Sequence, residues 1–216
     1  MREHQFWRLI RQSQRGTHTG PGFLTTMTKS RQQVIRLRHS VESLPFFEIV
    51  RFHHILQRIH QRANSWEMWT AFGIVLGSMD DENFREAVSW LILQGRRRFT
   101  RAVAQPDLLA ELEFDEDEVI DAEPLGGIIY DILVPLGNGD DVDETIAEEA
   151  IYDAFGFVGS ERPDGEQLSE DLPSLAARFP KLVAKHVAPG AEALPETAVL
   201  VPKHWCPDLA DQIGAP

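Results

Sequence analysis

The stretch SMDDENFREAVSWLILQGRRR, residues 78–98, combines an acidic cluster, an apolar segment with a tryptophan, and a basic triplet. Its apolar residues recur at helical spacing, and carboxylates at its start would cap the first turn of a helix. The triplet would lie late, where cations favour the negative end of the helix dipole. The pattern predicts a capped helix over residues 80–94, which Gly95 either breaks or lets continue. The buried face would be Phe84, Val88, Leu91 and Ile92.

Helical spacing of apolar residues recurs along most of the chain. It predicts helices over residues 4–13, 31–42, 45–62 and 66–76, and a short helix that begins at Pro106. Residues 145–155 and 171–186 have helical patterns too, and Pro180 divides the second of these. Strand signals are limited to residues 127–134 and 197–201. The sequence therefore predicts an all-α fold, a compact multi-helix domain.

Changes of composition set the predicted boundaries within the 216 residues. The chain becomes acidic after Leu112, and from Val187 onward frequent prolines leave little room for regular structure. We expect a helical core domain over residues 1–112, an acidic helical extension over 113–186 that packs on it, and an extended tail over 187–216.

The net charge of −13 conceals a division between the halves of the chain. Residues 1–105 contain 16 Lys and Arg against 8 Asp and Glu, and residues 106–216 contain 5 against 26, so the halves carry +8 and −21. A basic half can bind nucleic acid only if its cations form one exposed stripe. Attraction between the two halves is the simpler explanation, and it makes a nucleic-acid partner unlikely.

Cysteine content and hydropathy indicate a compartment. The single cysteine, Cys206, allows no intramolecular disulfide. No apolar run approaches the roughly 20 residues that span a bilayer, and the charged start lacks the apolar block of a secretory signal. We expect a cytoplasmic protein with no membrane partner.

Four segments of the first half resemble a known family: FWRLI, MWTAFGIVLG, DDENFREAVSWLILQG and AVAQPDLLAEL. They are similar to the bacterial domain-of-unknown-function family numbered 4240, whose members carry an F-W pair, an L-W-x-A helix, the run S-D-D-x-F-x-x-F/Y-R-x-W-L-I-x-x-G, and P-D-x-L-A. The resemblance covers residues 3–112, and more weakly 143–186. It implies a helical fold and no mechanism, because the family has no established activity. Val88 stands where the family has arginine, so any role of that arginine is either lost or passes to Arg85, one turn earlier.

Candidate site residues gather around the quoted helix. In a functional interpretation, Asp81 or Glu82 faces a pocket lined by Trp69 and Trp90 and acts as a ligand contact or base. Arg85 lies one turn after Asp81, at the spacing of a surface ion pair. Capping, pairing and burial explain the same residues without any function, and we favour that interpretation.

The histidines of the predicted helix over residues 45–62 were the other candidates. His53 and His60 would lie about 10.5 Å apart along the helix axis, too far to share one metal ion. The chain has no HExxH motif and no phosphate-binding glycine loop. We expect no metal and no cofactor, and we expect His53 to be half-buried and hydrogen-bonded rather than a general base.

Two hypotheses of function follow. The first is a non-catalytic binding or regulatory module for an unknown protein or small ligand, motivated by the aromatic residues around Trp69 and Trp90. The second is a small enzyme that uses carboxylate or histidine acid–base chemistry on a peptide or small metabolite. It requires Asp81, Glu82, Arg85 and His53 to converge on one cleft.

Overall fold

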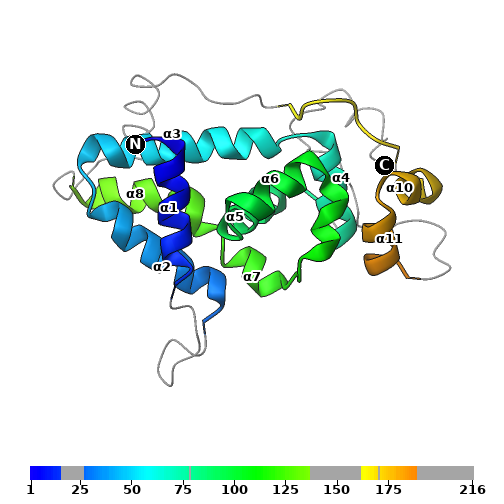
Figure 1. Cartoon of the computed structure of the whole chain (residues 1–216), viewed down its shortest axis with the longest axis horizontal. Coiled ribbons are helices and arrows are strands. Elements are labelled where there is room, and N and C mark those ends of the chain that lie inside the picture. Colours follow the sequence, from blue (N-terminus) through cyan, green and yellow to red (C-terminus); the bar gives the residue numbers. More distant parts are fainter. Residues whose placement is uncertain (16–26, 78, 137–161, 170, 189–216) are drawn as a thin grey trace, which may run out of the picture.

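The computed structural model describes residues 1–15, 27–77, 79–136, 162–169 and 171–188. In these ranges the regular structure is helical, and the one pairing of extended backbone is an isolated parallel bridge between Ser65 and Asp164. The predicted all-α fold is confirmed (Figure 1). The predictions for residues 145–155 and 197–201, and for nearly all of the tail, lie outside the described residues.

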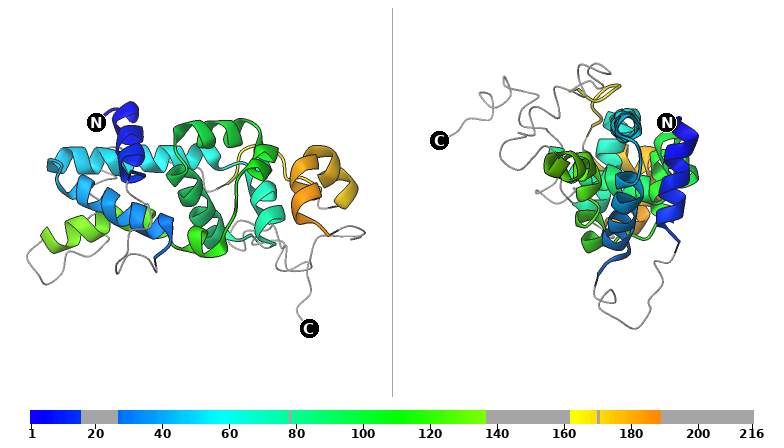
Figure 2. Two further views of the ribbon diagram at one scale, coloured as in Figure 1. Left: turned by 60° about the horizontal axis from the view of Figure 1, so that its bottom comes forward. Right: turned by 90° about the vertical axis from the view of Figure 1, so that its left-hand side faces the viewer.

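The described helices form two groups along the long helix α3 and beyond its end. In order they are α1 (Glu3–Ser13), α2 (Lys29–Glu42), α3 (Phe46–Ala63), α4 (Trp66–Leu76), α5 (Asp81–Leu93), α6 (Arg96–Ala104), the 3-10 helix η2 (Pro106–Glu111), α7 (Glu116–Ile120), α8 (Pro124–Leu136), α10 (Leu172–Arg178) and α11 (Pro180–His186). Figures 1 and 2 show α1, α2 and α8 around one part of the long α3, and α10 and α11 at the opposite end.

Side-chain caps fix where several of these helices begin. Ser65 Oγ accepts from the backbone N–H of Met68 at the start of α4 (3.3 Å). Asp80 Oδ1 accepts from the backbone N–H of Asn83 at the start of α5 (2.8 Å). Each cap satisfies a donor that the helix itself leaves without a partner. The acidic cluster of the quoted stretch therefore has a capping role, as expected.

One hydrophobic core joins helices from both halves of the chain. The four residues predicted for the buried face of α5 are all buried. Aromatic rings connect the layers: Trp69 stacks on Phe84 with ring centroids 4.3 Å apart, and Trp90 packs against Phe114 at 4.2 Å. Such ring pairs add to the burial energy, so α5 is held mainly by packing.

The candidate strand over residues 127–134 is wrong, because this stretch lies within α8. α8 packs against α2, α3 and α5, and Ile128, Ile129 and Ile132 are buried. A short apolar run rich in β-branched residues has the same pattern in a buried strand and in a buried helix. Only the tertiary contacts distinguish the two.

The predicted place of the basic triplet is also wrong. Gly95 has a φ of 93°, which ends α5, and Arg96, Arg97 and Arg98 form the first turn of α6. A side chain at Gly95 would be strained by this φ and would come within 3.3 Å of the Gln14 amide. The triplet thus lies at the positive end of a helix dipole, where cations are disfavoured.

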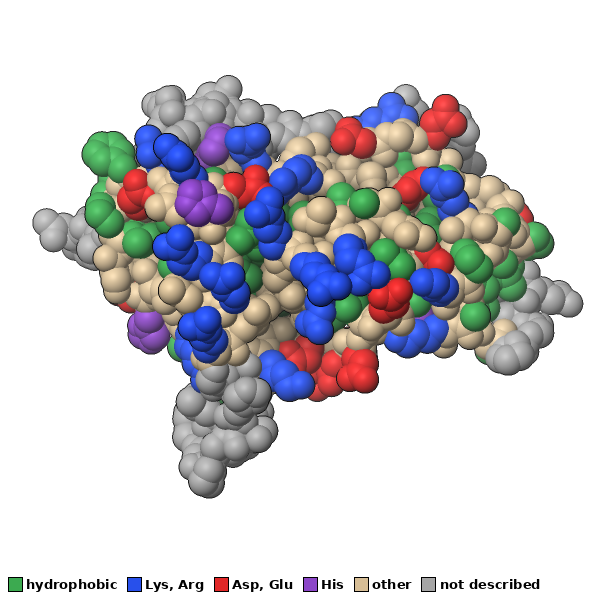
Figure 3. Space-filling model, in the orientation of Figure 1, with side chains coloured by type: hydrophobic (Ala, Val, Ile, Leu, Met, Phe, Trp, Pro, Cys, Tyr) green, Lys and Arg blue, Asp and Glu red, His purple; other side chains and the backbone are tan. Residues whose placement is uncertain are grey.

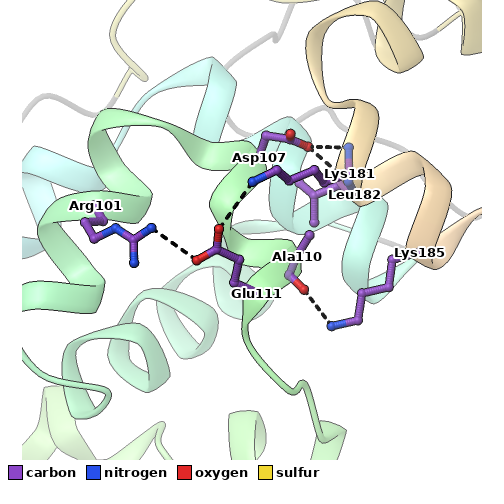
Figure 4. Close-up of polar contacts among 7 residues, drawn as sticks. All are labelled: Arg101, Asp107, Ala110, Glu111, Lys181, Leu182 and Lys185. Atoms are coloured by element: carbon purple, nitrogen blue, oxygen red, sulfur yellow. Dashed lines mark hydrogen bonds and ion pairs between the residues drawn. The ribbon is translucent and has the colours of Figure 1, made fainter.

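A polar contact joins α11 to η2 (Figure 4). The buried Asp107 accepts, through Oδ1, from the backbone N–H groups of Lys181 and Leu182, both at 3.0 Å. Asp107 therefore caps α11 from another element, and α11 has no cap from its own N-cap residue, Phe179. Leu175, Phe179 and Leu182 are buried beside this contact.

The side chains of Arg101, Lys181, Lys185 and Glu111 add to the contact between α11 and η2. Glu111 accepts from Lys181 Nζ at 3.2 Å and from Arg101 at 3.1 Å. Lys185 Nζ donates to the carbonyl oxygens of Ala110 (2.8 Å) and Leu112 (2.7 Å). We call this set the C-terminal clamp; its members are Arg101, Asp107, Glu111, Lys181 and Lys185. Each of these charged groups has a partner within the protein.

Candidate functional site

The two candidate tryptophans are part of the hydrophobic core. Trp69 is 1 % exposed and Trp90 is 2 % exposed. The Trp69 Nε1–H donates to Asn64 Oδ1 at 3.0 Å, so its polar atom is satisfied inside the protein. Both rings are used in packing, and neither presents a surface to a partner.

The candidate charged residues of α5 lie at its first two turns. Glu82 and Arg85 are exposed, and Arg85 Nε donates to the backbone carbonyl of Asp81 at 3.1 Å. Val88, by contrast, is fully buried. Arg85 and Val88 therefore lie in different environments, one exposed and one buried.

The carboxylates near this helix start repel one another. Burial raises the pKa of Glu86, and the charges of Glu82, Glu123 and Asp80 raise it further. In the part of the chain that the structure describes, no group of three His, Cys, Asp or Glu residues has the arrangement of a metal site.

The histidines of α3 lie deeper than expected. His53 is buried rather than half-buried. Burial, and then the charge of His54, lower the pKa of His53 to about 4. Burial also lowers the pKa of His60 to about 4, assisted by the charges of His53 and Arg85. Both imidazoles are therefore neutral at pH 7.

His60, considered from the sequence only as a metal ligand, joins α3 to α5. Its Nε2 lies 3.4 Å from the hydroxyl of Ser89, which is buried. The structure thus places Arg85 in contact with the backbone of Asp81, and His60 in contact with the hydroxyl of Ser89. A neutral, half-buried histidine that contacts a buried hydroxyl is typical of a satisfied interior polar group.

Exposed arginines from three helices gather on the surface shown in Figure 3, over α1, α6 and the adjoining part of α3. We call this surface the arginine face; its members are Arg8, Arg11, Arg62, Arg96, Arg97 and Arg98. The Trp7 and Phe99 rings pack 5.5 Å apart and hold α1 against α6. Arg8 and Arg11 are exposed; at about 100° per residue, Arg11 lies about 40° from Trp7 and so borders the side of α1 that meets α6.

Arg62 connects the three helices of the arginine face. Its guanidinium bonds to Glu3 of α1 at 3.1 Å, and its Cζ lies 5.9 Å from the centroid of the Phe99 ring of α6. Burial alone would raise the pKa of Glu3. The bonds from Trp7 and Arg62, with the charges of Arg62 and Arg96, outweigh burial and lower that pKa. Glu3, the sole carboxylate of α1 and α6, is thereby matched.

The acidic half of the chain does not neutralise the arginine face in the described structure. Ion pairs between the two halves are made by Arg38 with Asp131 (3.6 Å), by Arg101 with Glu111 (3.1 Å) and by Arg178 with Glu67, and none of the three involves a member of the arginine face. Arg8, Arg11 and Arg97 make no ion pair with any described carboxylate. Sequence reasoning had a signal for this surface in the charge of the first half, but it did not assign the residues.

The fold and this surface define an all-α protein with an exposed arginine cluster. The family model described as Protein of unknown function (DUF4240) matches residues 1–132, and the chain belongs to that family. The match extends past the predicted boundary at Leu112, through α7 and into α8, and it ends before α10 and α11. No curated protein and no solved structure matches the chain. No described helix is long and apolar enough to cross a membrane.

Proposed function

We propose that this protein is a cytoplasmic, non-catalytic binding module that contacts a negatively charged partner through the arginine face. One observation carries the proposal: exposed arginines of neighbouring helices share a surface and have few described carboxylates to pair with. Like charges gathered without partners cost free energy through repulsion. An arrangement that does not serve stability is best explained by a function outside the chain.

The position of the triplet supports this proposal. Arg96, Arg97 and Arg98 occupy the first turn of α6, which has no acidic residue to compensate them. Cations there weaken a helix by roughly 0.3–1 kcal/mol each. The C-terminal clamp differs from the arginine face in this respect, because each charged group of the clamp has a partner within the protein.

The alternative, an acid–base enzyme, receives less support. It needs His53 and the carboxylates of Asp81 and Glu82 around one accessible point. His53 is instead buried and neutral, whereas Glu82 is exposed at the start of α5. A base that a substrate cannot reach cannot take a proton from it.

Retention on heparin, a dense polyanion, tests the proposed surface. The variant Arg11→Gln/Arg97→Gln should elute at a lower NaCl concentration than the unmodified protein. Lys29→Gln/Arg31→Gln is the matched control, because it removes two exposed cations from the start of α2, where Glu118 binds the backbone N–H of Lys29 (2.8 Å). Equal elution of the two double variants, or no retention of the unmodified protein at 50 mM NaCl, would contradict the proposal.

A further inference from the structure

The composition of the arginine face distinguishes between classes of partner. Protein interfaces of appreciable affinity have an apolar, often aromatic centre within a polar rim. Among the described residues, the large hydrophobic side chains that are exposed are Phe46, Phe47 and Ile120. None of them lies on α1 or α6, and Phe47 is roughly 22 Å from Arg62 along the axis of α3. The arginine face lacks the anchor that a protein partner would need.

The neutral residues of this surface are polar as well. The exposed neighbours of the arginines include His4, Gln5 and Gln12 of α1 and Thr100 of α6. Interfaces with nucleic acid are polar and strongly positive, and most of their hydrogen bonds go to phosphate and sugar oxygens. The arginine face has this composition.

Every cation of the arginine face is an arginine and none is a lysine. The guanidinium group presents its donors in a planar fork that matches two phosphate oxygens, whereas a lysine acts as a point charge. Arginine is therefore the residue suited to a row of phosphates.

The net charge of −13 does not exclude an anionic partner. At physiological ionic strength the Debye length is about 8 Å, so an exposed charge acts over little more than its own neighbourhood. A phosphate in contact with Arg11 or Arg97 is screened from carboxylates on other sides of the molecule. The local charge decides binding, and the net charge sets only a weak background.

The described part of the arginine face also distinguishes duplex from single strand. Proteins that bind single strands without sequence preference stack the bases on exposed aromatic rings. The aromatic residues of α1 and α6 are Phe6, Trp7 and Phe99, and all three are buried. The described part of the arginine face therefore offers no exposed ring on which a base could stack. It can contact a continuous phosphate backbone.

From the sequence, nucleic-acid binding was conditional on cations that lie together on one exposed surface. The arginine face fulfils that condition. We infer that the arginine face binds the sugar–phosphate backbone of a nucleic-acid duplex without strong sequence preference. This inference rests on the proposed function and names the partner of the same surface.

Fluorescence anisotropy with labelled 20-base-pair DNA and RNA duplexes of two unrelated sequences tests the inference with the full chain. Affinity should fall steeply between 50 and 200 mM NaCl and should differ little between sequences. In Arg11→Gln/Arg97→Gln, affinity should fall about tenfold and the log–log salt slope should decrease by about two, one unit for each lost phosphate contact. Lys29→Gln/Arg31→Gln should change the affinity less than threefold.

Two further probes separate failure of the inference from failure of the proposed function. Poly-glutamate represents an acidic protein, and phosphatidylserine vesicles represent an anionic membrane. If either binds with the same dependence on Arg11 and Arg97 while the duplexes do not bind, the inference is wrong and the proposed function stands. If no probe binds in an Arg11- and Arg97-dependent way, both are wrong. If both double variants weaken duplex binding equally, the assignment to the arginine face is wrong.

Discussion

The C-terminal clamp and the arginine face are both surfaces of charged side chains, and they differ in how those charges are matched. In the C-terminal clamp, Asp107 and Glu111 accept from α11 and from Arg101, and Lys185 binds two backbone carbonyls. On the arginine face, Arg8, Arg11 and Arg97 have no described carboxylate partner. Charge density alone therefore says little about function. The groups that have no matching charge among the described residues are the informative ones.

If the C-terminal clamp belongs to the folded core, the apolar residue beside it should be the most sensitive position. Phe179 is 1 % exposed. Phe179→Ala should lower the free energy of unfolding by about 3–5 kcal/mol, through lost burial and the cavity left behind. Urea unfolding followed by circular dichroism measures this change.

Phe47→Ala makes the same substitution at a side chain that is 75 % exposed, and it is the matched control. Its effect should stay within about 0.5 kcal/mol. Similar losses at the two positions would mean that α11 is not packed as described.

The interior histidines should add a pH dependence that neither charged surface explains. The pKa values of His53 and His60 are about 4 in the folded protein against an ordinary 6.5. The unfolded chain takes up protons near pH 6.5, whereas the folded protein takes them up only near pH 4. Each of the two histidines should therefore lower the stability by about 2–3 kcal/mol as the pH drops from 6.5 to 4.

Urea unfolding at a series of pH values measures this loss. The double variant His53→Asn/His60→Asn should flatten the curve in that window, and His4→Asn at the surface should leave it unchanged. A curve that is flat in the unmodified protein would show that the histidines are protonated inside the fold.

Removing the cap of α11 should have a smaller effect than removing its apolar anchor. Asp107→Ala leaves the backbone N–H groups of Lys181 and Leu182 without an acceptor, which should cost about 1–2 kcal/mol. Asp107→Asn keeps one acceptor oxygen and should cost less. An exposed carboxylate elsewhere, Glu113, should tolerate alanine with no measurable change in the unfolding midpoint.

The smallest effect is predicted on the arginine face, and its sign is opposite. Arg97→Gln removes a cation from the first turn of α6 and should raise the free energy of unfolding by about 0.3–0.5 kcal/mol. Differential scanning calorimetry at low salt resolves such a shift, which should vanish at high salt. A loss of stability instead would mean that Arg97 has a structural partner and would remove the contrast with the C-terminal clamp.

The sequence was sufficient where local chemistry decides the structure. The bounds of α4, the acidic start of α5 and its four buried residues follow from spacing and hydrogen-bonding capacity, and the structure contains all of them. The division at Pro180 also holds, since α10 and α11 meet there. In each of these places, a short segment of sequence is enough to determine the local structure.

The sequence failed where distant segments decide. The apolar run at residues 127–134 becomes a helix because α2, α3 and α5 surround it. The burial of Trp69 and Trp90 depends on Phe84 and Phe114, so their density in the sequence could not distinguish a core from a binding surface. The arginine face likewise requires α1 to lie beside α6, some 85 residues later. No periodicity within either helix contains that information.

Phe114 links α11 to an optical reporter within the fold, the indole of Trp90. Its ring lies 4.2 Å from Trp90 of α5 on one side and 6.5 Å from the His186 ring of α11 on the other. Indole emission responds to the polarity of its surroundings, so departure of α11 should admit water near Trp90 and shift its emission to longer wavelength. A variant that retains Trp90 as its sole tryptophan would report on the docking of α11 without any attached dye.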